Sequence, residues 1–153
     1  MGCELSLLKC QLLNLVIIGN ENLRPDLPIE GECKIGIDFN ILKAKGETLF
    51  KIVLKISMEA NGENVNTGVR KLELEVEGVF QVSDNLDEQK LFNLLHFNGL
   101  TILYGVVRGI VMNVTGSFPG GRIILPCVNM AEIIERHYKK KKPSKSKKKK
   151  ITE

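Results

Sequence analysis

The segment Thr115-Gly-Ser-Phe-Pro-Gly-Gly-Arg-Ile-Ile-Leu-Pro-Cys-Val-Asn129 lies between a long apolar helix expected over residues 99–116 and a short amphipathic helix that begins at Asn129. Its prolines, Pro119 and Pro126, lack a backbone N–H and restrict the residues before them to extended conformations, so the segment cannot continue either helix. The sequence therefore predicts an extended connector with accessible apolar side chains: Phe118, Ile123, Ile124 and Leu125. Such a connector suits a protein that holds other chains better than one that does chemistry.

Upstream of the connector, four stretches have the periodicity of β-strands. Residues 4–18 are apolar on both alternations near their end, which is typical of a strand covered on both faces. Residues 32–41, 49–59 and 69–82 alternate polar and apolar side chains, which predicts half-buried strands. Asn61-Gly62 predicts a hairpin turn between the last two strands. The element order is therefore four strands followed by helices.

The outward side chains of the strands expected at 49–59 and 69–82 carry opposite charges. Lys51 and Lys55 lie on the first strand, and a row of glutamates lies on the second: Glu73, Glu75 and Glu77. A register centred near residue 64 would place Lys55 opposite Glu73. It would also place Lys51 opposite Glu77, and such cross-strand pairs contribute about 0.2–1 kcal/mol each. Charge pairing explains the acidic row at least as well as a docking role does.

Helices are expected after the strands. The first has Asp84 as its cap and an apolar side of leucines, Leu86, Leu91, Leu94 and Leu95. Residues 99–116 reach the length of a membrane span, but Arg108 and four glycines argue against insertion. A helix that is apolar nearly all round must be buried, and one small sheet cannot cover it. We therefore expect it to form an oligomer interface through Leu103, Tyr104, Val107, Val111 and Val114.

The last helix begins at Asn129, whose side chain can cap it with Glu132 reaching back, and its apolar face comprises Met130, Ile133, Ile134 and Tyr138. Helical order is expected to fade after Tyr138. The formal net charge of +4 conceals two parts, because nine lysines and one glutamate after Tyr138 contribute +8 and leave −4 for residues 1–138. We expect one folded domain over residues 1–138 and a disordered lysine-rich tail over residues 139–153, with no basic nucleic-acid-binding face in the folded part.

The cysteines and histidines show no metal-binding or catalytic pattern. Four cysteines sit in apolar runs without C-x-x-C spacing, which favours reduced core thiols: Cys3, Cys10, Cys33 and Cys127. His96 and His137 have no partner at i+3 or i+4 suited to a metal, which favours surface or helix-face positions. No phosphate-binding loop and no Ser, His and Asp arrangement stands out. We therefore predict a protein that is not an enzyme and needs no cofactor or metal.

The N-terminus carries one competing signal. Met1-Gly2-x-x-x-Ser6 fits the N-myristoylation pattern, and together with Cys3 and the lysine tail it could supply the two signals that stable membrane attachment requires. A signal peptide is not expected, because Glu4 comes early and Asn14 interrupts the apolar run. We expect a cytoplasmic protein.

The connector resembles that of the SecB protein-export chaperones. In that family a Gly-x-Phe-Pro and an apolar stretch lead to a leucine, a proline and an asparagine that opens the last helix. The matching residues here are Gly116, Phe118, Pro119, Leu125, Pro126, Val128 and Asn129. Within residues 99–116, Leu103, Tyr104 and Arg108 also match, while Gly105 replaces a proline. The resemblance covers roughly residues 4–138.

The resemblance implies an α+β fold, a four-stranded antiparallel sheet followed by helices packed on one side, in subunits that pair into dimers and then a dimer of dimers, a homotetramer. It also implies ATP-independent holding of unfolded chains in apolar grooves between sheet, connector and last helix, by burial worth about 25 cal/mol per Å². The expected client contacts are Phe118, Ile123, Ile124, Leu125 and Val128, with Phe80 and Val82 on the groove floor. The alternative is that these side chains plug the core.

The resemblance also implies partners. Glu73 matches a glutamate on the SecB sheet face that receives the tail of the SecA motor, which makes the row Glu73, Glu75 and Glu77 the expected docking site. SecB typically ends in an acidic tail and this chain ends in lysines, which favours a divergent SecB-like chaperone. Its clients would be unfolded preproteins or, as in some family members, the antitoxin of a toxin-antitoxin pair. The alternative is an oligomeric adaptor whose basic tail binds RNA or anionic membrane.

Overall fold

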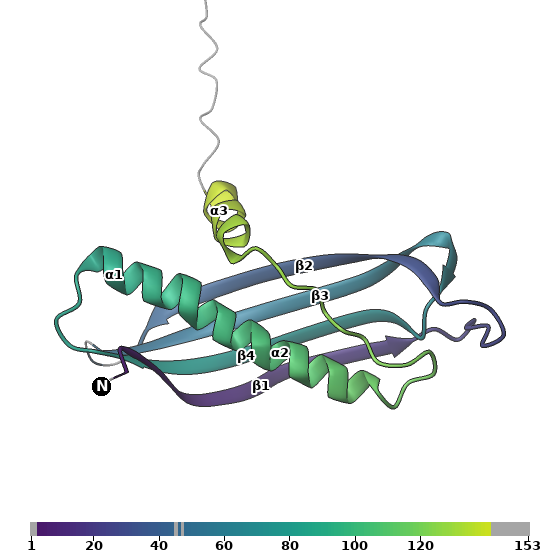
Figure 1. Cartoon of the computed structure of the whole chain (residues 1–153), viewed down its shortest axis with the longest axis horizontal. Coiled ribbons are helices and arrows are strands. Elements are labelled where there is room, and N and C mark those ends of the chain that lie inside the picture. The colour runs from purple at the N-terminus through teal and green to yellow at the C-terminus, as the bar shows by residue number, and fades with distance from the viewer. Residues whose placement is uncertain (1–2, 45, 47, 142–153) are drawn as a thin grey trace, which may run out of the picture.

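The computed structural model describes residues 3–44, 46 and 48–141, and it has the predicted α+β architecture (Figure 1). Strands come first and helices follow: β1 Leu5–Gly19, β2 Glu30–Lys43, β3 Leu49–Asn66, β4 Val69–Val82, α1 Glu88–Asn93, a π-helical turn η1 Leu94–Gly99, α2 Leu100–Thr115 and α3 Met130–Lys141. The strands form one antiparallel sheet in the order β1-β4-β3-β2, so β1 and β2 are its edges. The rod of α1, η1 and α2 crosses one face of the sheet, and α3 lies beside β2 (Figure 1).

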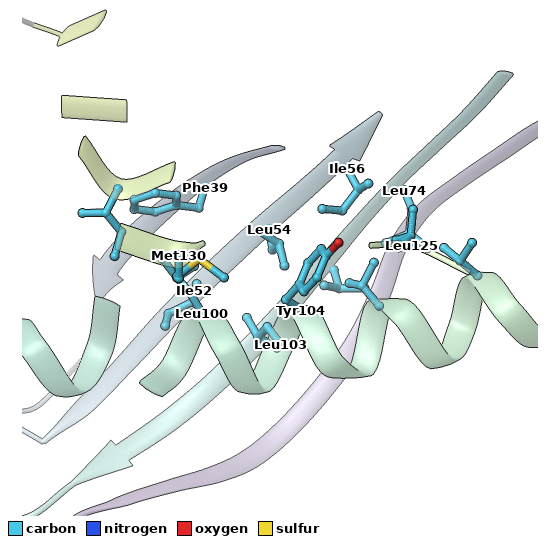
Figure 2. Close-up of a cluster of buried hydrophobic side chains, with 14 of the residues drawn as sticks. Phe39, Ile52, Leu54, Ile56, Leu74, Leu100, Leu103, Tyr104, Leu125 and Met130 are labelled. Atoms are coloured by element: carbon cyan, nitrogen blue, oxygen red, sulfur yellow. The ribbon is translucent and has the colours of Figure 1, made fainter. Parts of the chain in front are cut away.

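The core lies between the sheet and α2. Alternate residues of β3 and β4 are almost fully buried, including Leu72, Val76 and Phe80. Figure 2 shows others of this set, Ile52, Leu54, Ile56 and Leu74. A Cβ atom added at Gly78 of β4 would lie 2.7 Å from Cδ2 of Leu103, so the missing side chain lets α2 approach the sheet closely. This close approach buries the side of α2 that faces the strands.

The burial of α2 corrects an expectation. Leu103, Tyr104, Val107 and Val111 are at most 5% exposed within a single chain, and Val114 is half-buried. The chain's own sheet therefore covers the apolar side of this helix, and its buried side chains are not free to form an oligomer interface. By length and composition, Glu88–Thr115 is the one helix in the described part of the chain that could cross a membrane.

β1 is the second correction. Its apolar residues were expected to be covered on both faces, but the strand is an edge and much of it is exposed. Leu8 is 56% exposed, Leu12 46% and Leu13 44%. Leu12 lies opposite buried Val76 and Val16 opposite Glu73, so the exposed apolar side chains occur on both faces of the sheet.

The hairpin between β3 and β4 turns six residues later than predicted. β3 continues through Asn61-Gly62 to Asn66, because a bulge in its pairing with β2 absorbs the extra residues. Asn66 is buried, and its amide group accepts a hydrogen bond from the Arg24 N–H at 2.8 Å and donates to the Arg24 and Pro28 carbonyls at 3.0 Å each. These bonds fix the strand end against the loop that joins β1 and β2, and the chain then turns at Thr67-Gly68.

The helix boundaries also differ from the prediction. Asp87, rather than Asp84, caps α1, with its Oδ1 accepting from the Lys90 N–H at 2.7 Å. Asn85 between them adopts a left-handed conformation (φ 63°) that a helix excludes. Asn129 caps α3 as predicted, through the Ala131 N–H at 3.1 Å, but α3 continues to Lys141 instead of fading after Tyr138. The myristoylation pattern at Gly2 and the tail after Lys141 lie outside the described residues.

Candidate functional site

A groove of about 1010 Å³ lies between the sheet, the end of the connector and α3. Its sheet wall comes from residues 34–38 of β2, 55–57 of β3 and 73–75 of β4, and its other walls are residues 126–129 and one side of α3. Both charged and apolar side chains line the groove. The apolar ones are Ile35, Ile37, Ile56, Leu74, Pro126, Val128 and Ile133. The groove lies where the resemblance places one, but its lining is mixed rather than purely apolar.

The connector is held against α2 by polar side chains of that helix. Tyr104 Oη donates to the Pro126 carbonyl at 2.6 Å, and Arg108 Nε donates to the Leu125 carbonyl at 3.0 Å. Buried Thr115 Oγ1 accepts from the Ile123 N–H at 2.8 Å. Partial burial raises the pKa of Tyr104, against the opposing effect of the Arg108 charge, so the phenol stays a neutral donor. These bonds satisfy backbone groups that an extended segment cannot pair within itself.

The tip of the β3–β4 hairpin also contacts the connector. A Cβ atom at Gly68 would lie 1.7 Å from the Pro119 carbonyl oxygen, so only glycine lets the connector pass this close to the β3–β4 turn. Phe118 packs over Gly19 at the end of β1. The connector is therefore seated at both the helix and the sheet, which fixes the position of residues 126–129 at the groove.

The predicted client contacts divide into three groups. Leu125, Phe80 and Val82 are at most 5% exposed and belong to the core, so the alternative of core plugs holds for them. Phe118 and Ile123 of the connector are half-buried, and Ile124 is 67% exposed but lies outside the groove. Only Val128 of the predicted set lines the groove. The missed groove residues, chiefly Ile35, Ile37 and Ile133, lie on the apolar faces that periodicity predicts for residues 32–41 and for the last helix.

A cluster of rings fastens α3 to the rest of the protein. His96 of η1 is 5% exposed, stacks on Phe92 at 3.8 Å between ring centroids, and its Nδ1 lies 2.9 Å from the Phe92 carbonyl. A carbonyl only accepts, so Nδ1 carries the proton and Nε2 accepts from Tyr138 Oη of α3 at 2.5 Å. Burial lowers the pKa of His96, with the nearby His137 charge acting in the same direction. His96 is thus a buried neutral partner of α3 and not the surface residue that the sequence favoured.

His137 forms a second attachment of α3 to β2. Its ring stacks on Phe39 at 4.0 Å, and its Nδ1 lies 3.0 Å from Asp38 Oδ1. Partial burial of Asp38 acts to raise its pKa, but the hydrogen bonds from His137 and from the Phe39 N–H outweigh it and the pKa is lowered. The two histidines therefore hold the helix that forms one wall of the groove.

The acidic row on β4 is paired with lysines. Lys51 lies 3.4 Å from Glu77, Lys55 lies 3.9 Å from Glu75, and Lys71 lies 3.2 Å from Glu73. The register places Lys55 opposite Glu75 rather than Glu73, a shift of two residues from the predicted pairing. Charge pairing, one of the two predicted explanations, is thus present, and Glu73 and Glu75 also line the groove.

The four cysteines are free but exposed, which corrects the expectation of core thiols. Cys127 lies in the groove wall, and partial burial raises the pKa of Cys10 on β1. In the described part of the chain, no three or more His, Cys, Asp or Glu side chains come together as metal ligands would.

No protein-family model and no curated protein matches this sequence. Among solved structures, the chain is similar to a SecB-like chaperone of Mycobacterium tuberculosis, solved in complex with a ChAD peptide from the HigA1 antitoxin. The TM-score is 0.59 at 15% identity, over 82% of this chain and 91% of that one. A protein of unknown function from Streptococcus agalactiae gives a TM-score of 0.42 at 10% identity, over 82% of this chain and all of that one. The first likeness shows that this chain has a SecB-like fold.

Proposed function

We propose that this protein is an ATP-independent holding chaperone that binds non-native polypeptide segments in the groove between β2, the connector and α3. The observation that carries the proposal is the groove itself, which has an apolar and charged lining and is bounded by the connector. The SecB-like fold supports it, and the related chaperone was solved with an antitoxin peptide. Clients of this chain are then unfolded preproteins or an antitoxin.

Substitutions in the groove and in the core test the function, because a groove residue should affect client binding and a core residue should affect stability. Ile37→Ser together with Ile133→Ser removes half-buried apolar surface from two groove walls. We expect the doubly substituted full chain to stay folded and to suppress aggregation of a chemically unfolded model protein several-fold less well. Thermal melting and light scattering, measured in parallel, report the two properties.

Two further variants are the controls. Ile124→Ser changes an exposed side chain outside the groove and should alter neither property. Leu125→Ser opens the core and should lower the stability by about 2–5 kcal/mol. Undiminished capture by a folded Ile37→Ser, Ile133→Ser protein would contradict the proposed site.

A homo-oligomer is part of the proposal, with the interface moved from the buried side of α2 to β1. The exposed leucines of β1 and its open edge form an apolar surface of the kind that a second strand covers. Docking of a SecA-like motor on Glu73, Glu75 and Glu77 stays a proposal, in which an incoming basic group competes with Lys51, Lys55 and Lys71 for the carboxylates.

A further inference from the structure

The wall of the groove formed by β2 is a free sheet edge. β2 pairs with β3 on one side only, and α3 reaches it at Asp38 and Asn40, through His137 and Lys141. Residues 33–37 lie ahead of these contacts, and within them Lys34 and Gly36 are exposed while Ile35 and Ile37 are half-buried. An edge strand presents unpaired backbone N–H and C=O groups, to which an extended peptide can add as a further strand.

The charges of the groove select among peptides. Three of its four carboxylates have a cationic partner: Glu73 with Lys71, Glu75 with Lys55 and Glu132 with Arg136. The fourth, Asp38, bonds His137, which is charged only when protonated. Lys34, Lys140 and Lys141 line the same groove and form no ion pair with any residue that the structure describes. The lining holds five Lys or Arg side chains against four carboxylates, so the groove has a small excess of positive charge, and the sequence continues from Lys141 into further lysines.

Two of these lysines, Lys34 of β2 and Lys141 of α3, flank residues 35–39 of the edge strand. Lys34 precedes Ile35, and Lys141 Nζ lies 3.5 Å from Asn40 Oδ1 at the other end. Asn40 lies six positions along the strand from Lys34, roughly 20 Å at about 3.3 Å per residue. An occupant that pairs with this edge thus meets apolar side chains in the middle and cations at its ends.

We propose that the groove takes an extended client segment that adds to β2 as a strand, with alternating apolar residues bordered by aspartate or glutamate. This inference rests on the proposed function, because it names the class of segment that the holding site accepts. Main-chain pairing tolerates many apolar sequences, while the lysines favour those flanked by acidic residues.

Labelled synthetic peptides test the charge preference by fluorescence anisotropy on the full chain. One peptide alternates valine and serine between aspartate pairs, and its twin carries lysine pairs instead. We expect the aspartate peptide to bind about tenfold more tightly, with a difference that shrinks as salt is added. Lys34→Glu with Lys140→Glu should reverse the preference, whereas Lys9→Glu with Lys43→Glu, exposed and outside the groove, should leave it unchanged.

Backbone methylation tests the strand pairing. N-methyl groups on one alternation of the aspartate peptide remove the N–H groups that face β2 and should weaken binding about tenfold, while methylation of the other alternation should not. Equal binding of the aspartate and lysine peptides, or equal effects of the two methylation patterns, would overturn this inference while leaving the groove as a holding site. Peptide binding that is indifferent to Ile37→Ser with Ile133→Ser would instead overturn the proposed function.

Discussion

Tyr104 and Arg108 show how a residue can be identified correctly and its role still be mistaken. Both match the SecB pattern and were expected within an oligomerising helix. In the structure Tyr104 and Arg108 donate to consecutive connector carbonyls, those of Pro126 and Leu125, and so position the wall of the groove. The role changed because a hydrogen bond across 17 or 22 residues of sequence cannot be read from local periodicity.

Val107 leads to a prediction at the same scale. Its side chain is fully buried between α2 and the sheet of one chain, so Val107→Asp places an unpaired charge in that core. We expect the substitution to lower the free energy of unfolding by about 3–5 kcal/mol, rather than only to dissociate an oligomer. Urea denaturation followed by circular dichroism measures the loss.

The adjacent Val106 supplies the matched control, because its side chain is only partly buried whereas Val107 is fully buried. Val106→Asp should shift the urea midpoint far less. A Val107→Asp protein with the wild-type midpoint would show that the helix does not pack as described.

At the scale of elements, α3 depends on contacts with partners far away in the sequence. Its own sequence provides a cap and an apolar face, but its position comes from the pairs Tyr138 with His96 and His137 with Asp38. The π-helical turn η1 contributes because His96 lies within it and is buried beneath α3. π-Helical segments often occur at functional sites, and this one supports a wall of the groove.

The His96 contact predicts a pH dependence of stability. Its folded pKa is lowered by burial, whereas the unfolded chain has the ordinary value of about 6.5. Just below that ordinary value the unfolded state binds more protons than the folded state, so stability falls as the pH drops from about 6.5 toward the lowered pKa. Asp38, lowered from an ordinary value of 3.8, contributes only at more acidic pH.

Urea titrations at pH 7.5 and pH 5.5 measure this effect. The wild type should be less stable at the lower pH, and His96→Gln should show a smaller difference between the two. His137→Gln removes the neighbouring imidazole, whose charge also lowers the pKa of His96, and so measures that contribution separately. An equal pH dependence in wild type and His96→Gln would refute the assignment.

At the scale of the whole molecule, the strand order decides which apolar surface remains uncovered. β1 and β2 are both edges, but they differ in surroundings. β2 has α3 and the connector beside it, whereas β1 exposes leucines on a strand that the sequence describes as apolar on both faces. The apolar residues on both faces of β1 are explained if a second copy of the chain packs against this strand and buries them.

Leu12→Arg tests that arrangement. We expect the wild type to sediment as an oligomer and the variant to sediment at lower mass with a nearly unchanged melting temperature, because Leu12 is 46% exposed in the single chain. Leu42→Arg, on β2 and 54% exposed, is the matched control and should keep the wild-type mass. A wild type that sediments as a stable monomer would contradict the proposed interface.

The sequence by itself determined the kind and order of the elements, because periods of two and of about 3.6 residues, prolines and the Asn129 cap act over a few neighbouring residues. It also located the connector between the two helices. Only the tertiary structure decided the hairpin turn, the partners of the glutamate row, and which apolar residues line a groove and which fill the core. Ile37 and Leu125 are both apolar, but their burial differs. Ile37 lies on the edge strand β2, whereas Leu125 is held against α2 by a hydrogen bond from Arg108 to its carbonyl. Burial depends on what packs opposite a side chain, and that partner lies far away along the chain.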